Sequence, residues 1–340
     1  RGSDRGANMI ARAHKERGAA LLTVLMIVAA MSVAALAITK AVTDATKRSQ
    51  ALDSQAQLAL YAVAAEEVAK ARMADVLAPL ENRLFADLPG LGEPQIIPVD
   101  GGVFTVTAQD ATNCFDINTL TTNGDDGKLV GDVSAQRTYQ ALLTAAVDEG
   151  FVSDIAGLAA SVTDWMDANS VPANGGAEDS YYLSEVPSYR TSGQKLATIE
   201  ELRAIRGYTP DILLRIAPLI CVLPEDMSLQ RQQLNINTLT EDQAALLQAV
   251  LGDTLSLDDV KGLILSRPQG GWPDVEALLE DPAVKRVDPS SIEADRLGVV
   301  SSLVEVSANV SYRGHDMTMR YLFEAVPGRP IRTLRRERIG

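Results

Sequence analysis

The most distinctive chemistry in the sequence is a run of oxygen-bearing side chains between positions 164 and 179. Gly175 and Gly176 interrupt this run and allow the backbone to fold back on itself. Calcium takes roughly six to eight oxygen ligands from carboxylates, amides and carbonyls on a loop that wraps around the ion. We therefore predict a calcium site. Its expected ligands are Asp167, Asn169, Glu178 and Asp179, with weaker candidates in Asp164 and in the carbonyls near Val171 and Gly176.

The spacing of these ligands differs from that of an EF-hand, so an acidic solvated loop is the alternative to a metal site. Asp116 and Asn118 form a second, weaker candidate for calcium. We accordingly expect one or two calcium ions. Residues 123–126 also contain acidic side chains, but their sequence is more typical of a turn than of a metal site.

Enzymatic chemistry has little support in this sequence. The pairs Asp164/Asp167 and Glu178/Asp179 do not exclude a glycosidase. Two such carboxylates are common in a chain with 45 acidic residues, however, and aromatic residues for stacking sugars make up only 4%. The two histidines, His14 and His315, lie in an N-terminal basic segment and an expected turn. No glycine-rich phosphate loop, nucleophile elbow or histidine metal motif occurs. We expect no catalytic residue, no organic cofactor and no small-molecule substrate.

The net charge of −14 argues against nucleic acid as a partner of the main domain. The basic exception is the C-terminal segment, with five arginines between Arg329 and Arg338. We expect that segment to be a disordered, solvated tail.

The only two cysteines, Cys114 and Cys221, lie far apart in the chain. Their spacing fits no zinc motif, and in an exported protein a disulfide between them is favoured over two free thiols. We predict that disulfide.

The apolar run Ala19–Ile38 contains no charged residue. Twenty helical residues span about 30 Å, which is the thickness of a bilayer core. Basic residues at Arg12, Lys15 and Arg17 precede the run, so the short N-terminus is expected in the cytoplasm and the rest of the chain outside. The alternative is an ordinary signal peptide cleaved after Ala37, because residues 35–37 fit the A-x-A pattern.

Beyond the apolar run, the sequence continues as an amphipathic helix. No glycine or proline occurs from Ala19 to Ala78, so one long helix is expected to end near Pro79. Its predicted buried face consists of Leu58, Tyr61, Ala62, Ala65, Val68, Ala69, Met73, Val76, Leu77 and Leu80, which recur at spacings of three and four.

Strand composition appears at residues 102–109 and again, in alternating pattern, at residues 301–313 and 317–325. Residues 313–316 are expected to join the last two strands as a hairpin turn. The intervening sequence is mostly helical and contains an internal echo, in which Asp116-Ile-Asn118-Thr returns as Asn235-Ile-Asn237-Thr. Capping boxes begin at Thr198 and Thr240. The helices expected in the insertion are 200–206, Ile212 to Cys221, 242–251, 257–266, and one that begins at Pro273. The predicted fold is α+β, a long helix on a small antiparallel sheet with a large helical insertion.

Several motifs together resemble the K-type minor pseudopilins of type II secretion. They are the junction Arg17-Gly18-Ala19-Ala-Leu-Leu-Thr23, the segment from Cys114 to Asn118, Asp164-Trp-Met-Asp167, the segment from Gly176 to Tyr182, and residues 234–238. Thr23 stands where most pilin-like proteins have glutamate, a departure shared with the K type. The resemblance covers nearly all of Met9–Val326.

The resemblance implies a pilin-like fold, calcium in the helical domain, cleavage by a prepilin peptidase after Gly18 and N-methylation of Ala19. It also implies an inner-membrane anchor, a periplasmic bulk, and assembly with I- and J-type minor pseudopilins and the major pseudopilin at the pseudopilus tip. The alternatives are a soluble exported calcium-binding protein and a membrane-anchored receptor that grips DNA through a helix-hairpin-helix. The acidic hairpin at residues 251–255 argues against DNA.

Residues 1–8 precede Met9, which we expect to be the start. The expected divisions are a leader at 1–18, the membrane half of the long helix at 19–38, the rest of that helix with a loop and first strands at 39–112, an insertion at 113–299 with modules 113–233 and 234–299, the last strands at 300–326, and the basic tail at 327–340.

Overall fold

The computed structural model describes residues 4–81, 83–147, 152, 154–224, 233–252, 254–326 and 328–339, with side chains from Leu21 onward. The chain forms two compact units, each described separately below. The first contains residues up to Tyr61 and the hairpin tip Ser311–Asp316, and the second contains Ala62–Val310 and Met317–Gly340. The candidate site belongs to the second unit.

The long helix α1 (Asp4–Leu77) is continuous, as the absence of glycine and proline predicts. A 3-10 turn at Ala78–Leu80 follows it, with Pro79 inside the turn, so the predicted end of the helix is confirmed. In the described part of the chain, the stretch Leu21–Leu80 contains an apolar window long enough to cross a membrane, with a mean hydropathy of 2.7 and no buried residue.

The first unit includes a short turn at the end of a hairpin. Arg313 and Gly314 have φ values of 49° and 79°, and a two-residue turn with positive φ at both positions matches the right-handed twist of the strands it joins. The Tyr312 ring lies 5.5 Å from that of Tyr61 in an edge-on arrangement. The turn predicted at residues 313–316 is confirmed.

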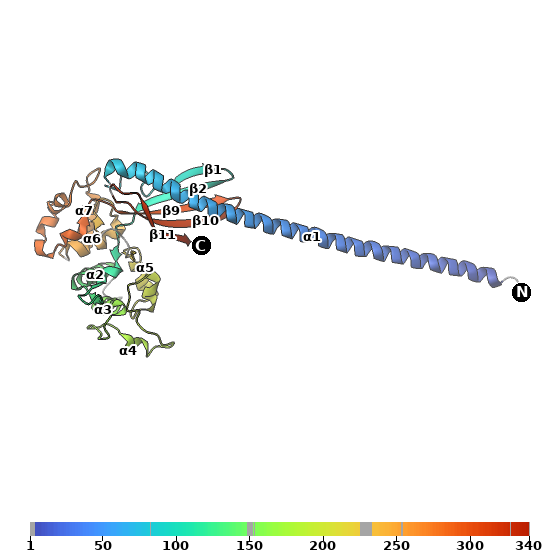
Figure 1. Ribbon diagram of the computed structural model, residues 1–340, viewed down its shortest axis with the longest axis horizontal. Helices are drawn as coiled ribbons and strands as arrows, with labels where there is room; N and C mark the ends of the chain where they lie inside the picture. The colour runs from blue at the N-terminus through green and yellow to red at the C-terminus, as the bar shows by residue number, and fades with distance from the viewer. Residues whose placement is uncertain are drawn as a thin grey trace. The chain divides into compact units, whose positions relative to one another are not determined.

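The second unit is built on a five-stranded sheet with the order β1-β2-β9-β10-β11 (Figure 1). The strands β1 and β2 form an antiparallel hairpin in which Ile97 faces Phe104, and β11 pairs antiparallel with β10. β1 falls within residues 80–101, where the sequence pattern predicts no strand, whereas β2 coincides with the strand predicted at residues 102–109. The strand bounds are β1 (Gln95–Val99), β2 (Gly102–Asp110), β9 (Leu303–Tyr312), β10 (His315–Glu324) and β11 (Arg332–Ile339).

One face of α1 packs on this sheet. The small side chains Ala65 and Ala69, followed by Met73 and Leu77, are buried against Val304, Val306, Tyr321 and Phe323. The Tyr321 hydroxyl donates a hydrogen bond of 2.8 Å to the Ala62 carbonyl. Val68 and Val76, which the periodicity placed on the buried face, are instead 47% and 45% exposed, because the buried stripe is narrower than predicted.

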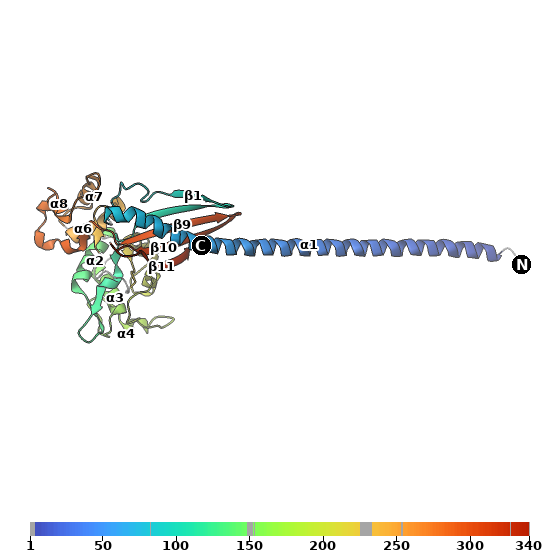
Figure 2. The same ribbon diagram turned by 45° about the horizontal axis from the view of Figure 1, so that its top comes forward.

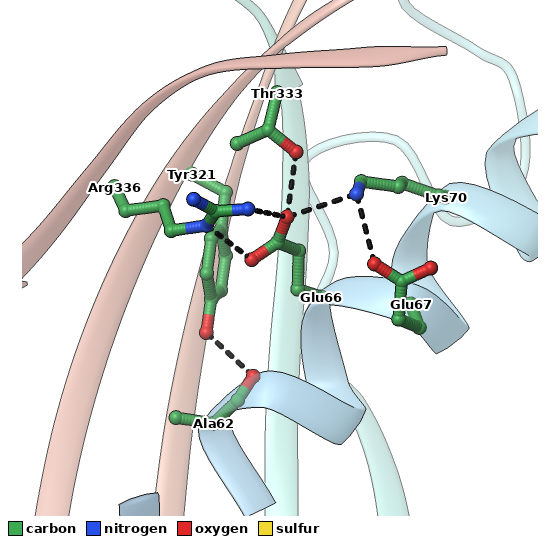
Figure 3. A network of polar contacts seen from close by, with 7 residues as sticks. All are labelled: Ala62, Glu66, Glu67, Lys70, Tyr321, Thr333 and Arg336. Atoms are coloured by element: carbon green, nitrogen blue, oxygen red, sulfur yellow. Dashed lines mark hydrogen bonds and ion pairs between the residues drawn. The ribbon is translucent and has the colours of Figure 1, made fainter. Parts of the chain in front are cut away.

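The C-terminal segment is ordered, so the prediction of a disordered tail is wrong. Residues 332–339 form the edge strand β11. Glu66 of α1 holds this strand, because the Arg336 guanidinium donates to both of its carboxylate oxygens at 2.6 and 2.8 Å and the Thr333 hydroxyl donates at 2.6 Å (Figure 3). Lys70 also lies 2.9 Å from Glu66.

The helical insertion leaves the sheet after β2 and returns before β9. Its helices lie together beyond one end of the sheet in both views (Figures 1 and 2). The departure and return points are close, since the Ala111 amide donates to the Leu303 carbonyl at 3.1 Å. The helices are α2 (Val133–Ala146), α3 (Ile155–Met166), α4 (Asp179–Tyr182), α5 (Pro210–Ile216), α6 (Ala244–Leu251), α7 (Leu257–Leu265) and α8 (Val275–Leu279), with short strands β3 (Phe115–Asp116), β4 (Thr121–Asn123), β5 (Leu129–Gly131), β6 (Ile220–Cys221), β7 (Leu234–Asn235) and β8 (Leu297–Gly298).

The internal echo has a structural counterpart. The Asn118 side chain donates to the Leu196 carbonyl and accepts from the Leu196 amide at 3.0 and 2.8 Å. The Asn237 side chain makes the same pair of bonds with Trp272, at 2.9 and 2.7 Å. Each repeated motif therefore joins a short strand to a later loop through one buried asparagine.

The predicted disulfide between Cys114 and Cys221 is present, with a sequence separation of 107 residues. Cys221 lies in β6, which pairs parallel with β3, whereas the sequence pattern predicts a helix as far as this residue. The capping boxes at Thr198 and Thr240 are confirmed, although each opens a 3-10 segment, Ile199–Ala204 and Glu241–Gln243, rather than an α-helix. Hydrogen bonding by both caps satisfies otherwise free backbone amides.

Candidate metal centre

The candidate site begins at the C-terminal end of α3. Asp154 caps the start of this helix by accepting from the Gly157 amide at 2.8 Å. The helix is buried on most sides, and Asp164 in its last turn is only 1% exposed. Asp167 follows as the C-terminal cap, with its amide bonded to the Thr163 carbonyl. Asp164 and Asp167 are three positions apart on a helix end, so both side chains lie on one side.

The loop after Asp167 closes over Asp164. The Ala173 amide donates to both Asp164 oxygens at 3.2 and 3.1 Å. Gly176 lies so close that a Cβ added there would be 2.0 Å from an Asp164 oxygen. A side chain at position 176 would displace the Asp164 carboxylate, so glycine allows the close approach, and the loop then brings Glu178 to the same place.

Asp164, Asp167 and Glu178 converge. Each contributes an oxygen, and these three oxygens all lie within 4.8 Å of one another. All three residues are buried, and Glu178 is 2% exposed. The Glu178 Oε1 atom has no hydrogen-bond donor within the described residues. A buried carboxylate oxygen without a partner is costly, so this atom requires a proton or a cation.

Burial dominates the electrostatics of the cluster. It raises the pKa of Asp164 to about 6, with a further contribution from the negative charge of Asp167. It also raises the pKa of Glu178 to about 7, again with repulsion from the two aspartates. The pKa of Asp167 is raised by burial as well. Three carboxylates that resist ionisation together form a site suited to a hard cation.

Aromatic side chains that neighbour the cluster in the sequence pack against one another. The Trp165 ring lies edge-on to Tyr182 at 5.1 Å, and Tyr189 packs on Tyr182 at 5.2 Å. The Arg206 amide donates to the Tyr182 hydroxyl at 3.2 Å.

Two of the main predicted ligands do not join the cluster as expected. Asp179 turns away, because its carboxylate pairs with Arg190 and accepts from the amide and hydroxyl of Thr191 at 3.0 Å. Asn169 is exposed, and its Oδ1 accepts from the Val171 amide at 2.7 Å. Its own amide donates to Asp167, so Asn169 orients a predicted ligand.

The weaker candidates lie in different places. Asp164 lies in the cluster with Asp167 and Glu178. The Gly176 carbonyl accepts a hydrogen bond of 2.9 Å from Arg206, and the Val171 amide donates to Asn169. At the second candidate, Asp116 accepts from the amides of Asn118 and Leu223 at 3.1 and 3.3 Å, which gives these residues a structural role. Among the described residues they form no acidic cluster of three.

Comparison with known proteins assigns the chain to a family. A family model described as type II secretion system (T2SS), protein K, matches residues 113–225, and a second model with that description matches residues 234–299. The type II secretion system protein K of Pectobacterium carotovorum subsp. carotovorum is 35% identical over 269 residues, which cover 78% of this chain and 79% of that protein. The chain belongs to the type II secretion system protein K family.

A second relative extends the match. The type II secretion system protein K of Aeromonas hydrophila is 30% identical over 318 residues, which cover 89% of this chain and 94% of that protein. A solved chain in the GspK-GspI-GspJ complex from the enterotoxigenic Escherichia coli Type 2 Secretion System has a TM-score of 0.72 and 25% identity, covering 86% of this chain and 99% of that one. The K-type resemblance and the pilin-like α+β fold are confirmed, and the chain is a type II secretion minor pseudopilin.

Proposed function

We propose that this minor pseudopilin works at the tip of the type II secretion pseudopilus. There it joins I- and J-type minor pseudopilins, helps to initiate assembly with the major pseudopilin, and so supports protein export across the outer membrane. The observation that carries the proposal is the likeness to a chain solved in a GspK-GspI-GspJ complex, which covers 86% of this chain and 99% of the solved one. The role is structural and needs no catalysis.

Two features of the chain support a terminal position. A helical insertion between β2 and β9 adds bulk that an ordinary pilin-like subunit lacks, and it would hinder another subunit from stacking above. Thr23 stands in the apolar run where pilin-like proteins usually carry glutamate. That glutamate would pair with the amino terminus of an earlier neighbour, and unpaired charges in hydrocarbon cost several kcal/mol. The first subunit has no earlier neighbour, so threonine is tolerated.

The tip assembly is tested by purifying the full chain in detergent with the I- and J-type pseudopilins of its own secretion system. We expect one complex that contains all three. If the chain elutes alone at micromolar concentration of all partners, the proposed assembly is wrong. A Thr23→Glu variant that assembles unchanged would remove the charge argument only.

We further propose that the chain is anchored in the inner membrane by its apolar helix, with its bulk in the periplasm. A prepilin peptidase would cut after Gly18, and Ala19 would then be N-methylated. Support comes from the basic residues before an unbroken apolar run. Mass spectrometry of the protein from native membranes should find a methylated Ala19 terminus. A chain that begins at Ile38 would instead show an ordinary signal peptide.

We also propose that Asp164, Asp167 and Glu178 bind calcium. Support comes from their convergence, their burial and the orphaned Glu178 oxygen. Carboxylate oxygens are the ligands that calcium prefers, and bound calcium would neutralise charges that otherwise repel. Isothermal titration of the chelator-treated chain with calcium should show saturable binding, and heat changes equal to those of buffer would contradict it.

A further inference from the structure

An apolar groove lies between α1 and the β1–β2 hairpin. It encloses about 550 Å³, and its lining includes Val68, Arg72 and Val76 from α1 and Ile96, Ile97 and Phe104 from the hairpin. All of these residues belong to the second unit. The groove is separate from the carboxylate cluster, none of whose residues lines it.

The groove is pre-formed by the loop that closes one end. Leu91 forms a bridge with Ala108, and the Gly92 amide donates to the Ala108 carbonyl at 2.7 Å. Gly90 and Gly92 have φ values of 88° and 73°, which favour glycine, so the sequence fixes the turn. Because backbone bonds hold the loop, the groove does not depend on an occupant for its shape.

Several large apolar side chains of the groove are open to solvent. Ile96 is 71% exposed and Ile97 is 36% exposed, beside the half-exposed Val68 and Val76. Isolated exposed apolar residues are ordinary, but a contiguous set that lines one hollow marks an interaction site.

Arg72 gives this apolar surface a polar specificity. It stands four residues after Val68 and four before Val76, so the three form one ridge of α1. Within the described residues, Arg72 has no hydrogen bond or ion pair, whereas Lys70, two positions earlier, pairs with Glu66 and Glu67. An unpaired cation in an apolar wall selects an occupant that carries a carboxylate.

The α1 side of the groove favours a helix as occupant. The floor of the groove contains the small side chains Ala65 and Ala69 of α1 together with apolar side chains of β2 and β9, and β1 is the edge strand beside it. A ridge with i, i+4 spacing on α1 is also the surface on which helices pack.

We propose that this groove binds an apolar α-helix of a partner pseudopilin, with an Asp or Glu of that helix against Arg72. The inference rests on the proposed assembly with I- and J-type pseudopilins and adds to it the surface and the chemistry of the contact. A peptide strand, a lipid tail or a second copy of this chain are the alternative occupants.

The first test measures affinity. The full chain in detergent is titrated with the purified I- and J-type pseudopilins, for the wild type and for Arg72→Glu. We expect the Kd of Arg72→Glu to rise by at least about tenfold, because the variant places like charges together. Arg137→Glu on α2 is the matched control, since it is an exposed arginine outside the groove with the same charge change, and its Kd should stay within about twofold.

The second test identifies the occupant. Both native cysteines are in the disulfide, so Val76→Cys introduces a unique thiol for a photo-reactive label. We expect cross-links to a helical segment of one partner that contains Asp or Glu. Leu214→Cys on α5, which is 76% exposed, is the control and should give none. Cross-links from Val76→Cys to a strand, to detergent or lipid, or to a second copy would overturn the inference.

The outcomes separate the two proposals. If the wild-type chain binds neither partner, the proposed assembly fails and the groove inference fails with it. If the wild type binds and Arg72→Glu binds equally well, the assembly stands and the groove inference is wrong. Unchanged circular dichroism and melting temperature show that Arg72→Glu is folded, and Ile96→Asp serves as a second groove variant.

Discussion

At the scale of single residues, Glu178 and Asp179 are neighbours with different roles. The Glu178 carboxylate faces Asp164 and Asp167, while the Asp179 carboxylate is held by Arg190 and Thr191. We predict that Glu178→Gln weakens calcium binding by at least about tenfold, because one charged ligand is lost. Isothermal titration measures this loss.

Asp179→Asn is the matched control for Glu178→Gln, because it removes one carboxylate next in sequence but outside the cluster. Its calcium affinity should equal that of the wild type. The wild type should also melt at a higher temperature in excess calcium, since a ligand at a hundred times its Kd stabilises by about 2.7 kcal/mol. Equal losses in both variants would show that the cluster is not the site.

The environment of Glu66 predicts that the stability of the fold depends on pH. Hydrogen bonds from Arg336, supported by Thr333 and Lys70 and opposed by burial, lower its pKa from 4.5 to about 2. A carboxylate with a depressed folded pKa stabilises the fold fully above its unfolded pKa, and this contribution is lost as the pH falls from about 4.5 to about 2. Glu66→Gln should therefore destabilise by about 2 kcal/mol at pH 7.

Urea unfolding of wild type and Glu66→Gln between pH 7 and pH 3 measures the effect. The difference in the free energy of unfolding should be constant at neutral pH and shrink below about pH 4.5. Asp75→Asn, on the exposed side of α1, is the control and should show no such trend. A difference that is independent of pH would contradict the pairing.

At the scale of elements, β11 completes the sheet. It covers the edge of β10 and supplies Arg336 and Thr333 to Glu66. We predict that ending the chain after Val326 lowers the melting temperature by several degrees and promotes aggregation, because a long strand edge and a buried carboxylate are left without partners. Differential scanning fluorimetry and light scattering measure both effects.

The same truncation in the Glu66→Gln background should lower the melting temperature by less, because the neutral side chain leaves no buried charge when Arg336 is removed. Identical losses in the two backgrounds would mean that β11 stabilises the sheet without Glu66.

The disulfide acts on another element pair. It joins Cys114 next to β3 with Cys221 in β6 across 107 residues. In the chain-entropy model, opening so long a loop costs about 5 kcal/mol. We predict that Cys114→Ala with Cys221→Ala lowers the unfolding free energy of the insertion by up to that amount. Urea unfolding followed by tryptophan fluorescence reports it, because Trp165 and Trp272 both lie in the insertion. An unchanged midpoint would show that the disulfide adds no stability there.

At the scale of the whole molecule, the insertion and the sheet have separate cores. The chain leaves and re-enters the sheet at adjacent points, where the Ser301 hydroxyl donates to Asp110. We predict that replacing residues 113–299 by a short Gly-Ser linker leaves a folded helix and sheet, because the linker spans a short gap. Circular dichroism and a cooperative melt would show this, and a molten product would contradict it.

The sequence by itself determined the elements whose signals are local. The long helix follows from the absence of glycine and proline, the β9–β10 hairpin from alternation around Arg313 and Gly314, and the disulfide from having only two cysteines. The cation-site prediction at residues 164–179 also arose there, because oxygen-bearing side chains cluster along the chain. The position of Glu66 on the buried face of an amphipathic helix is a further local signal, because a buried carboxylate needs a partner, but periodicity alone does not identify that partner.

Only the tertiary structure decided which side chains meet. The Asp179 carboxylate pairs with Arg190 and so does not join the carboxylate cluster. Asp164 lies at the centre of that cluster because the loop through Gly176 closes over it. The arginine-rich tail became a strand because Glu66, far away in the sequence, binds Arg336. A carboxylate satisfies its charge with whichever cation or donor folding brings near, and that choice depends on contacts between distant residues which composition and periodicity do not contain.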